Sequence, residues 1–381
     1  MVMRVLIMAG GTGGHVFPAL AVAEQLRDRG VEVTWMGTRK GLEADVVPQA
    51  GFAMEWVSVT GLRGKGLLSW MLAPLRLCQA LFQSLVILMR RRPMAVLGMG
   101  GFVAGPGGLM AWLLKRPLLI HEQNAVAGLT NRLLARLADR VMEAFPQTLP
   151  ERFHPQLTGN PVREDIAALA APEQRFAGRQ DGLRLLVLGG SLGARALNDI
   201  MPPMLGLLPT DMAIQVRHQA GQRNIDAARQ AYAACAGFSP ENIKVEPFID
   251  DMAAAYGWAD LVLCRAGALT VAELAAAGVA AILVPFPHAV DDHQSRNAAW
   301  LADTGAAILV PQSDLTPAGL AGQLCQLWQP GENVGVDETG EPVAMRPERQ
   351  RLFRMAIKAR AMACRDAAEQ VALACLEVAH G

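Results

Sequence analysis

Short apolar runs alternate with longer segments of helical periodicity along most of the chain. Runs rich in leucine and β-branched residues predict buried strands, and the amphipathic segments between them predict helices. The expected strands are Arg4–Met8, Glu32–Met36, Ala95–Leu97, Leu118–His121, Arg184–Leu188, Ile214–Arg217, Leu261–Leu263 and Ala281–Val284. This alternation is typical of doubly wound parallel sheets, so the predicted fold class is α/β.

The pattern at the N-terminus occurs a second time. The stretch RVLIMAGGTGGH, at residues 4 to 15, has its counterpart in LRLLVLGGSLGAR at 183 to 195, and each predicts a strand, a glycine turn and a helix. The turn-rich stretch TGNPVRED at 158 to 165 lies between them. We therefore expect two Rossmann-like domains, 1–161 and 162–347, that face each other across a ligand cleft. Residues 329–347 lack periodicity and predict a loop, whereas 348–381 predict helices.

The overall composition gives no reason to expect a nucleic acid, a metal ion or a cofactor as a partner. The 381 residues include 35 basic and 35 acidic side chains, so net charge gives no reason to expect a nucleic-acid partner. The six cysteines and the carboxylates lack metal-ligand spacing, and the nearest approach, Asp291-Asp292-His293, is expected to be a solvated loop. We therefore expect no metal and no bound cofactor. The N-terminus begins directly as a strand, so no export signal is expected.

The region between Trp56 and His121 contains eight basic residues and no acidic one. Within it, 67–89 is too polar for a membrane span but predicts an amphipathic helix. Packing of the apolar face on the core is the structural alternative. Because anionic lipid attracts basic residues, we expect peripheral attachment to a membrane surface. The expected contact residues are Trp70, Leu75, Phe82, Leu85, Arg90, Arg91 and Trp112.

Glycine clusters follow three of the predicted strands, at 10–14, 98–108 and 189–195. Amides at the start of a helix bind phosphate when glycines let it approach, although one such cluster can also be only a tight turn. The dinucleotide fingerprint fails, because its third glycine falls on Val16 and the strand 32–36 ends in Gly37-Thr38. No GK[ST] motif follows either. An NAD-linked oxidoreductase and a P-loop ATPase are therefore disfavoured.

Eight blocks in order carry a resemblance to a known family. They are GGTGGHVFPALAVAEQL, GLRGKG, GMGGFVAGPGG, HEQNAVAGLTNRLLAR, GNPVR, GGSLGARALN, FIDDM and CRAGALTVAELAAAG. Together they resemble the MurG family of peptidoglycan N-acetylglucosaminyltransferases. The resemblance implies a GT-B fold whose last helices cross back to the first domain. It also implies transfer of N-acetylglucosamine from UDP-GlcNAc to the C4 hydroxyl of lipid I, giving lipid II with inversion, at the cytoplasmic face of the bacterial inner membrane.

The resemblance also assigns expected contacts. Glu273 would bind the ribose, although Thr270 and Glu273 also fit a capping box. Ser191, which could equally be a helix cap, and Arg163 would face the donor diphosphate. Amides of Asn124 and Gln294 would bind the donor sugar. The remaining expected donor contacts are Thr12, Gly13, Gly14, Ile249, Ala268, Leu269, Val271 and Ala272, and the glycines expected near the acceptor diphosphate are Gly11, Gly101 and Gly105.

His15 is the first candidate for the general base that inversion requires, because an imidazole titrates close to neutral pH. A histidine that only orients the glycine loop is the alternative, and Glu122 is the second candidate base. Two other classes stay open: a UDP-sugar epimerase on the same fold, and a non-enzymatic sugar-nucleotide-binding subunit. The basic amphipathic segment argues against the epimerase.

Overall fold

A computed structural model describes residues 2–59, 72–190, 193–235, 240–330, 340 and 342–380. The expected sites at Trp70 and Ser191 lie outside these residues, as do the start of the amphipathic segment 67–89 and most of the loop expected at 329–347. The chain forms two units. The first comprises Met1–Arg163 and Cys364–Gly381, and the second comprises Glu164–Ala363.

The first unit is built around a seven-stranded sheet in the order β3-β2-β1-β4-β5-β6-β7, and all of its strand pairs are parallel. Its strands are β1 Arg4–Met8, β2 Glu32–Gly37, β3 Ala53–Trp56, β4 Ala95–Gly98, β5 Leu118–Glu122, β6 Arg140–Glu143 and β7 Gln156–Leu157. Its helices are α1 Gly13–Asp28, α2 Glu43–Gln49, α4 Ala73–Arg91, α5 Ala104–Leu113, α6 Leu129–Leu134 and α16 Ala367–His380. The strand order reverses between β1 and β4, which is where such sheets bind ligands.

The second unit repeats this plan with a six-stranded parallel sheet in the order β10-β9-β8-β11-β12-β13. Its strands are β8 Leu183–Leu188, β9 Ile214–Gln219, β10 Ile243–Glu246, β11 Leu261–Cys264, β12 Ala280–Leu283 and β13 Ala307–Leu309. Its helices are α7 Glu164–Ala167, α8 Pro172–Phe176, α9 Arg195–Leu205, α10 Ile225–Ala233, α11 Met252–Trp258, α12 Ala268–Ala277, α13 His293–Ala302, α14 Pro317–Leu327 and α15 Gln350–Ala361. The sequence repeat thus corresponds to two similar folds.

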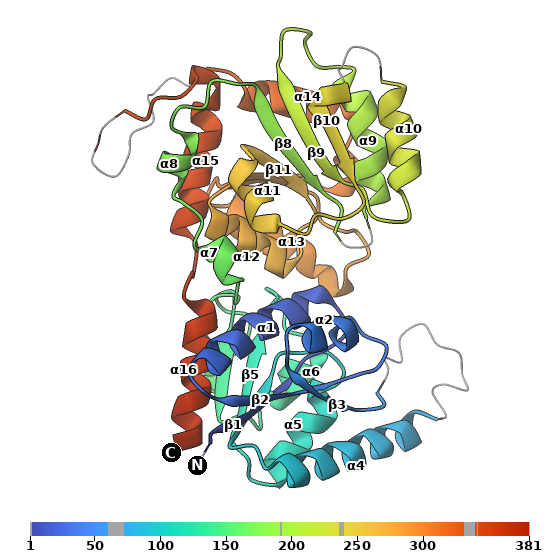
Figure 1. Ribbon diagram of the computed structural model, residues 1–381, viewed down its shortest axis with the longest axis vertical. Helices are drawn as coiled ribbons and strands as arrows, with labels where there is room; N and C mark the ends of the chain where they lie inside the picture. The colour runs from blue at the N-terminus through green and yellow to red at the C-terminus, as the bar shows by residue number, and fades with distance from the viewer. Residues whose placement is uncertain are drawn as a thin grey trace. The chain divides into compact units, whose positions relative to one another are not determined.

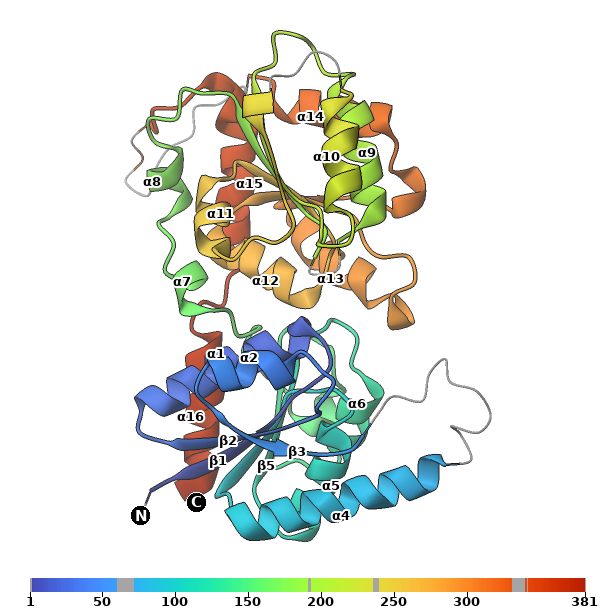
Figure 2. The same ribbon diagram turned by 45° about the vertical axis from the view of Figure 1, so that its right-hand side comes forward.

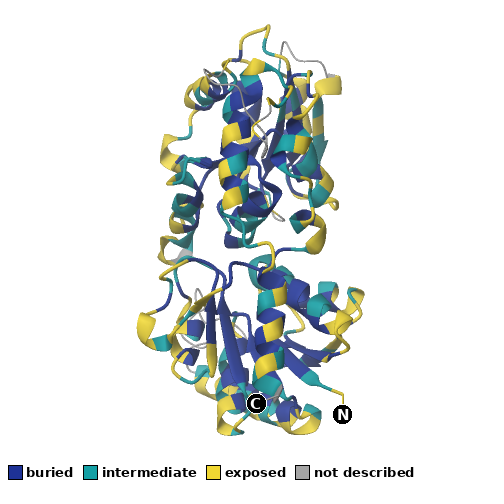
Figure 3. Ribbon diagram, turned by 90° about the vertical axis from the view of Figure 1, so that its left-hand side faces the viewer, coloured by how far each residue is buried: buried dark blue, intermediate teal, exposed yellow. Residues whose placement is uncertain are grey.

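Strand alternation gives the first sheet two buried faces. Val5 and Ile7 pack with α1 and α16, whereas Leu6 and Met8 pack with α4 and α5. Figures 1 and 2 show these helix pairs on opposite sides of the sheet. In Figure 3 the strands of both units are mostly buried, and the exposed positions lie along the outer sides of the helices.

The C-terminal segment differs from the expectation that 348–381 would pack on the first domain. The apolar face of α15, with Leu352 and Phe353, belongs to the core of the second unit. Only α16 packs in the first unit, where Val371 and Cys375 join the cluster around α1. The two helices belong to different units because the apolar face of α15 packs in the core of the second unit and that of α16 packs in the core of the first.

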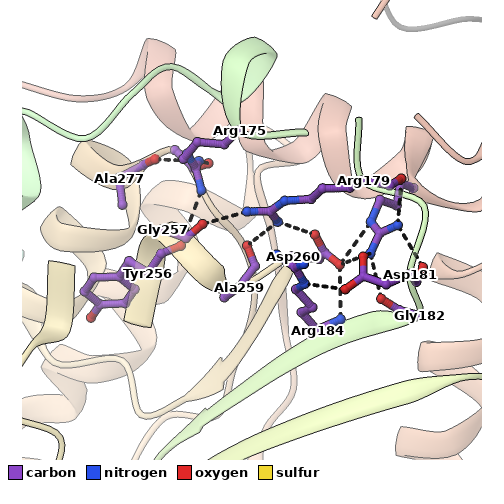
Figure 4. A network of polar contacts seen from close by, with 12 residues as sticks. Arg175, Arg179, Asp181, Gly182, Arg184, Tyr256, Gly257, Ala259, Asp260 and Ala277 are labelled. Carbon is purple, nitrogen blue, oxygen red and sulfur yellow. Dashed lines mark hydrogen bonds and ion pairs between the residues drawn. The ribbon is translucent and has the colours of Figure 1, made fainter. Parts of the chain in front are cut away.

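A buried polar network holds α15 on the second sheet (Figure 4). The fully buried side chain of Arg349 donates to Oδ2 of Asp260 at 3.1 Å and to Oδ1 of Asp181 at 2.8 Å. Asp260 also accepts from Arg179 and from the N–H of Arg184. Asp260 precedes β11 and Arg184 is the second residue of β8, so the network lies at the amino ends of these strands, opposite the turns that follow their carboxyl ends.

Candidate functional sites

The glycine turns after β1 and β4 meet at the switch point of the first sheet. Thr12 is the N-cap of α1, and Gly13 and Gly14 form its first turn. Gly101 has a φ of +80°, and a Cβ built on it would lie 2.4 Å from the carbonyl oxygen of Gly10. The two turns therefore pack so closely that only glycine fits between them.

His15, in the first turn of α1, is connected to the interior of the first unit through two further side chains. Its Nδ1 lies 2.8 Å from Oε1 of Gln123. Nε2 of Gln123 lies 3.1 Å from Nδ1 of His121, and Nε2 of His121 lies 3.0 Å from the carbonyl oxygen of Gly159. Gln123 and His121 are fully buried, whereas His15 is half-buried. The candidate base thus lies at the switch point, and its Nδ1 is held by the buried side chain of Gln123.

His121 and Glu122 are consecutive residues of β5, so their side chains face opposite sides of the sheet. Because His121 lies on the side of His15, Glu122 points away from it. Its carboxylate is buried and accepts hydrogen bonds from the N–H groups of Asn124 and Gly128 and from the amide of Asn131. The side chain of Asn124, an expected sugar ligand, lies 3.3 Å from the same carboxylate. In this arrangement Glu122 orders the loop after β5, and its catalytic role stays a prediction.

Glu43 is a buried carboxylate that the sequence analysis missed. Its Oε2 accepts the N–H of Gly11 at 3.0 Å, and its Oε1 accepts the N–H and hydroxyl of Thr38 at 2.9 and 2.8 Å. A Cβ on Gly10, Gly37 or Gly41 would lie 2.8 Å or less from this side chain. Glycines at these positions therefore leave room for a carboxylate that joins the turns after β1 and β2.

In the second unit, α12 begins at Ala268 after the N-cap Gly267. Thr270 is therefore the third residue of the helix rather than its cap, and the capping box considered from the sequence is wrong. The carboxylate of Glu273 instead accepts a 3.0 Å hydrogen bond from the hydroxyl of Tyr256, at the end of α11. Ala268, Leu269, Thr270, Val271, Ala272 and Glu273, the expected donor contacts of this segment, thus form the first turns of one helix.

Other expected donor residues occupy defined positions. Ile249 is buried, and its N–H donates to Oε1 of Gln219 at 3.1 Å. Gln294, in α13, accepts the N–H of Phe286 through Oε1 at 2.9 Å. Arg163 is the last residue before the chain enters the second unit.

The described part of the amphipathic helix expected at 67–89 forms α4, and the expected contact residues Leu75 and Phe82 lie on its exposed side. Ile87 and Leu88 are buried, and Leu85 is half-buried. Leu75, Phe82 and Met89 lie on one side of the helix and are 68%, 66% and 59% exposed. Trp112, on the adjacent α5, is 47% exposed. We call Leu75, Phe82, Met89 and Trp112 the α4–α5 patch.

The acid-free stretch is partly neutralised by a residue just before it. Glu55, in β3, pairs with both Arg90 and Arg91. Its carboxylate is almost buried, so the two arginines contribute less positive charge to the surface than the sequence suggested. No helix within the described residues is long and apolar enough to cross a membrane. Among the same residues, no cluster of histidine, cysteine, aspartate and glutamate has the arrangement of a metal site.

Comparison with known proteins identifies the family. Residues 5–143 match the glycosyltransferase family 28 N-terminal domain, and residues 184–340 match the corresponding C-terminal domain. The chain belongs to glycosyltransferase family 28. Its full length is 56% identical, over 381 residues, to the full-length UDP-N-acetylglucosamine--N-acetylmuramyl-(pentapeptide) pyrophosphoryl-undecaprenol N-acetylglucosamine transferase of Nitrosococcus oceani. The enzyme of the same name from Alkalilimnicola ehrlichii is also 56% identical, over 380 residues and all of both chains.

Solved structures place this family 28 chain on the expected fold. The crystal structure of Acinetobacter baumannii MurG is 41% identical, with a TM-score of 0.79, and the match covers 98% of this chain and 99% of that one. The fold is therefore GT-B. The calicheamicin glycosyltransferase CalG4, at 19% identity and a TM-score of 0.62, shares the fold alone. A putative UDP-N-acetylglucosamine 2-epimerase from Listeria monocytogenes, at 14% identity and a TM-score of 0.66, likewise shares only the fold.

Four residues with defined contacts were missed from the sequence: His121, Gln123, Glu43 and Tyr256. A signal existed for Gln123. Leu119 and His121 alternate along β5, Gln123 follows directly after the strand in the same alternation, and Leu119 packs in the same cluster as α1. Glu43 and Tyr256 meet their partners only through tertiary contacts, for which a single sequence gave no signal.

Proposed function

We propose that this family 28 glycosyltransferase moves N-acetylglucosamine from UDP-GlcNAc to lipid I, giving lipid II for peptidoglycan synthesis. The observation that carries the proposal is the 56% identity to a transferase of that name over the full length of both chains. The acceptor atom is proposed to be the C4 hydroxyl of the N-acetylmuramyl sugar, and the reaction is proposed to invert the anomeric carbon.

In the proposed reaction His15 is the general base. The acceptor hydroxyl oxygen attacks the anomeric carbon while the bond from that carbon to the UDP oxygen breaks, and its electron pair leaves with UDP. The hydroxyl proton passes to the imidazole of His15. Its position at a helix start beside the switch point supports this role.

Donor recognition is assigned mainly to the second unit. Glu273 binds the ribose, Ile249 lies against uracil, and the start of α12 faces the diphosphate, where helix amides favour an anion. Ser191 and Arg163 stabilise the leaving phosphates. Asn124 and Gln294 bind the donor sugar, together with the loop of Thr12, Gly13 and Gly14.

The acceptor is assigned to the first unit. Because the N–H of Gly11 already donates to Glu43, Gly101 and Gly105 are the more suitable of the three expected glycines for the lipid diphosphate. The α4–α5 patch is proposed to contact an anionic bilayer surface at the cytoplasmic face of the inner membrane. Leaving-group stabilisation is assigned to protein groups without a resident metal or cofactor.

The test is a transfer assay with a soluble lipid I analogue, comparing wild type with His15→Ala and Glu273→Ala. His15→Ala should lower kcat by roughly 10²- to 10⁴-fold with little change in the KM for UDP-GlcNAc. Glu273→Ala should chiefly raise that KM. His154→Asn, at an exposed histidine with a φ of +46°, is the matched control and should behave as wild type.

Two outcomes would contradict parts of the proposal separately. Full turnover in His15→Ala would remove the base assignment but leave the activity. Binding of UDP-GlcNAc by wild type without sugar transfer would indicate the non-enzymatic binding subunit instead.

A further inference from the structure

The hydrogen bonds behind His15 determine which of its ring nitrogens carries a proton. The chain of contacts runs from His15 through Gln123 and His121 to the carbonyl of Gly159, over distances of 2.8, 3.1 and 3.0 Å. A carbonyl oxygen can only accept a hydrogen bond, so it gives the chain a direction. Each step can then be assigned from the inside outward.

His121 is neutral and carries its proton on Nε2. That nitrogen faces the carbonyl of Gly159 and must therefore donate. Burial lowers the pKa of His121 to about 4, despite the opposing effect of this hydrogen bond, so the ring is uncharged at neutral pH. Its Nδ1 consequently presents a lone pair to Gln123.

The amide of Gln123 has only one satisfactory orientation. Its Nε2 lies within 3.1 Å of both Nδ1 and the carbonyl oxygen of His121, and it also lies 3.9 Å from the sulfur of Met99. All three groups are acceptors, so the NH₂ group must point toward them. The opposite orientation would place the amide oxygen against these acceptors, in a fully buried position. Oε1 therefore faces His15.

A carbonyl-type oxygen beside Nδ1 of His15 requires that nitrogen to donate. The neutral ring of His15 then has its lone pair on Nε2. Gly100 packs against this ring, since a Cβ there would lie 2.9 Å from both Cε1 and Nδ1. The carboxylates on the surrounding elements, Glu43 and Glu122, accept hydrogen bonds from other groups.

From this geometry we propose that Gln123 and His121 are positioning residues that hold His15 in the Nδ1–H tautomer and present Nε2 as the atom that receives the acceptor proton. The proposal rests on the role of His15 given above for its catalytic meaning. It is a specific claim, because the neutral imidazole of an unconstrained histidine mostly carries its proton on Nε2. The tautomer can also be measured without substrate.

The experiment is long-range ¹H–¹⁵N NMR of the full chain labelled at its seven histidines, recorded at alkaline pH. The His15→Gln variant assigns the resonances of His15. Wild type should show the Nδ1–H form. Gln123→Met, which removes the acceptor oxygen but keeps the side-chain length, should shift His15 toward the Nε2–H form. Gln123→Glu keeps an oxygen toward Nδ1 and should retain the wild-type tautomer, although its second oxygen then faces the acceptors of His121 and should lower the stability of the variant.

The kinetic constants of the same Gln123 variants provide the second measurement. Gln123→Met should lower kcat by roughly 10- to 100-fold with the KM for UDP-GlcNAc within about twofold, and Gln123→Glu should recover much of that loss. An Nε2–H tautomer in wild type would overturn the proposal and needs no variant to fold. An unchanged tautomer in folded Gln123→Met would also overturn it. Full turnover in His15→Ala would instead refute the base assignment, while the NMR result would still decide whether Gln123 fixes the ring.

Discussion

The hydroxyl of Tyr256, which is fully buried, donates a 3.0 Å hydrogen bond to Oε2 of Glu273. The end of α11 thereby anchors a carboxylate on α12 that is half-exposed. Tyr256→Phe removes this bond at almost constant volume. Since hydrogen bonds to charged groups contribute about 1.5 kcal/mol or more, we expect the KM for UDP-GlcNAc to rise roughly tenfold while kcat changes by less than about twofold.

The control for this change is Tyr232→Phe, at the other tyrosine of the chain. Its hydroxyl contacts the buried His218 at 2.7 Å and has no part in the proposed donor site. This variant should leave the donor KM unchanged. A UDP donor that lacks the ribose hydroxyls should bind wild type and Tyr256→Phe equally well, and a persistent difference would argue against the assigned ribose contact.

Arg349, which donates to Asp260 and Asp181, is expected to be the most sensitive position of the buried polar network. Its substitution by methionine leaves Asp260 buried with fewer partners, so the second unit should lose about 3 to 5 kcal/mol of unfolding free energy. Thermal denaturation measures this loss. Arg354→Ala, at an exposed position of α15, the helix that begins directly after Arg349, is the control and should change stability by less than about 0.5 kcal/mol. A similar melting temperature for both variants would show that the network contributes little.

The α4–α5 patch should determine affinity for lipid vesicles. Phe82→Ser removes a side chain that is 66% exposed, and cosedimentation with anionic vesicles should weaken roughly tenfold because transfer of that ring into the bilayer is lost. Leu207→Ser, in the second unit at 56% exposure, is the control for the loss of an exposed apolar side chain. Equal losses in the two variants would place the membrane contact elsewhere.

Stability should fall on acidification because of buried histidines. Burial lowers the pKa of His218 from 6.5 to about 4. Between these values the unfolded chain binds a proton that the folded chain does not, so the contribution is complete above pH 6.5 and is lost as the pH falls to about 4. It amounts to about 3 kcal/mol. His218→Gln should therefore lose less stability than wild type from pH 7 to pH 4 in denaturant titrations, and parallel curves would contradict the assignment.

The long strands were predictable because buried strands leave a clear apolar pattern. β1 has the bounds expected from the sequence, and β2 extends by one residue. The short strands β3, β6, β7, β10 and β13 were missed, since they are brief and partly polar or exposed; both residues of β7, for example, are exposed. The pattern also could not divide α15 from α16, because both helices are amphipathic and the sequence does not say which core each one joins.

The candidate sites were predictable to the level of motifs but not of contacts. His15 and Glu273 stand in recognisable segments, whereas the partners that orient them, Gln123 and Tyr256, depend on strand parity and on packing between helices. On α4 the sequence located an amphipathic helix whose Leu75 and Phe82 are exposed, but Leu85, also expected to be a contact residue, is half-buried. Helical periodicity defines faces, and only tertiary packing decides which face is covered.

Glu43 affects where the first unit can bind a phosphate group. A nucleotide phosphate that approached Gly11 would meet the carboxyl group of Glu43 where the glycine turn would otherwise offer an open amide. Glu43 thus takes up the amide of Gly11 from inside the first unit, which leaves Gly101 and Gly105 to meet a phosphate there. Two units with the same backbone plan can therefore differ in their binding properties through a single buried side chain, here Glu43.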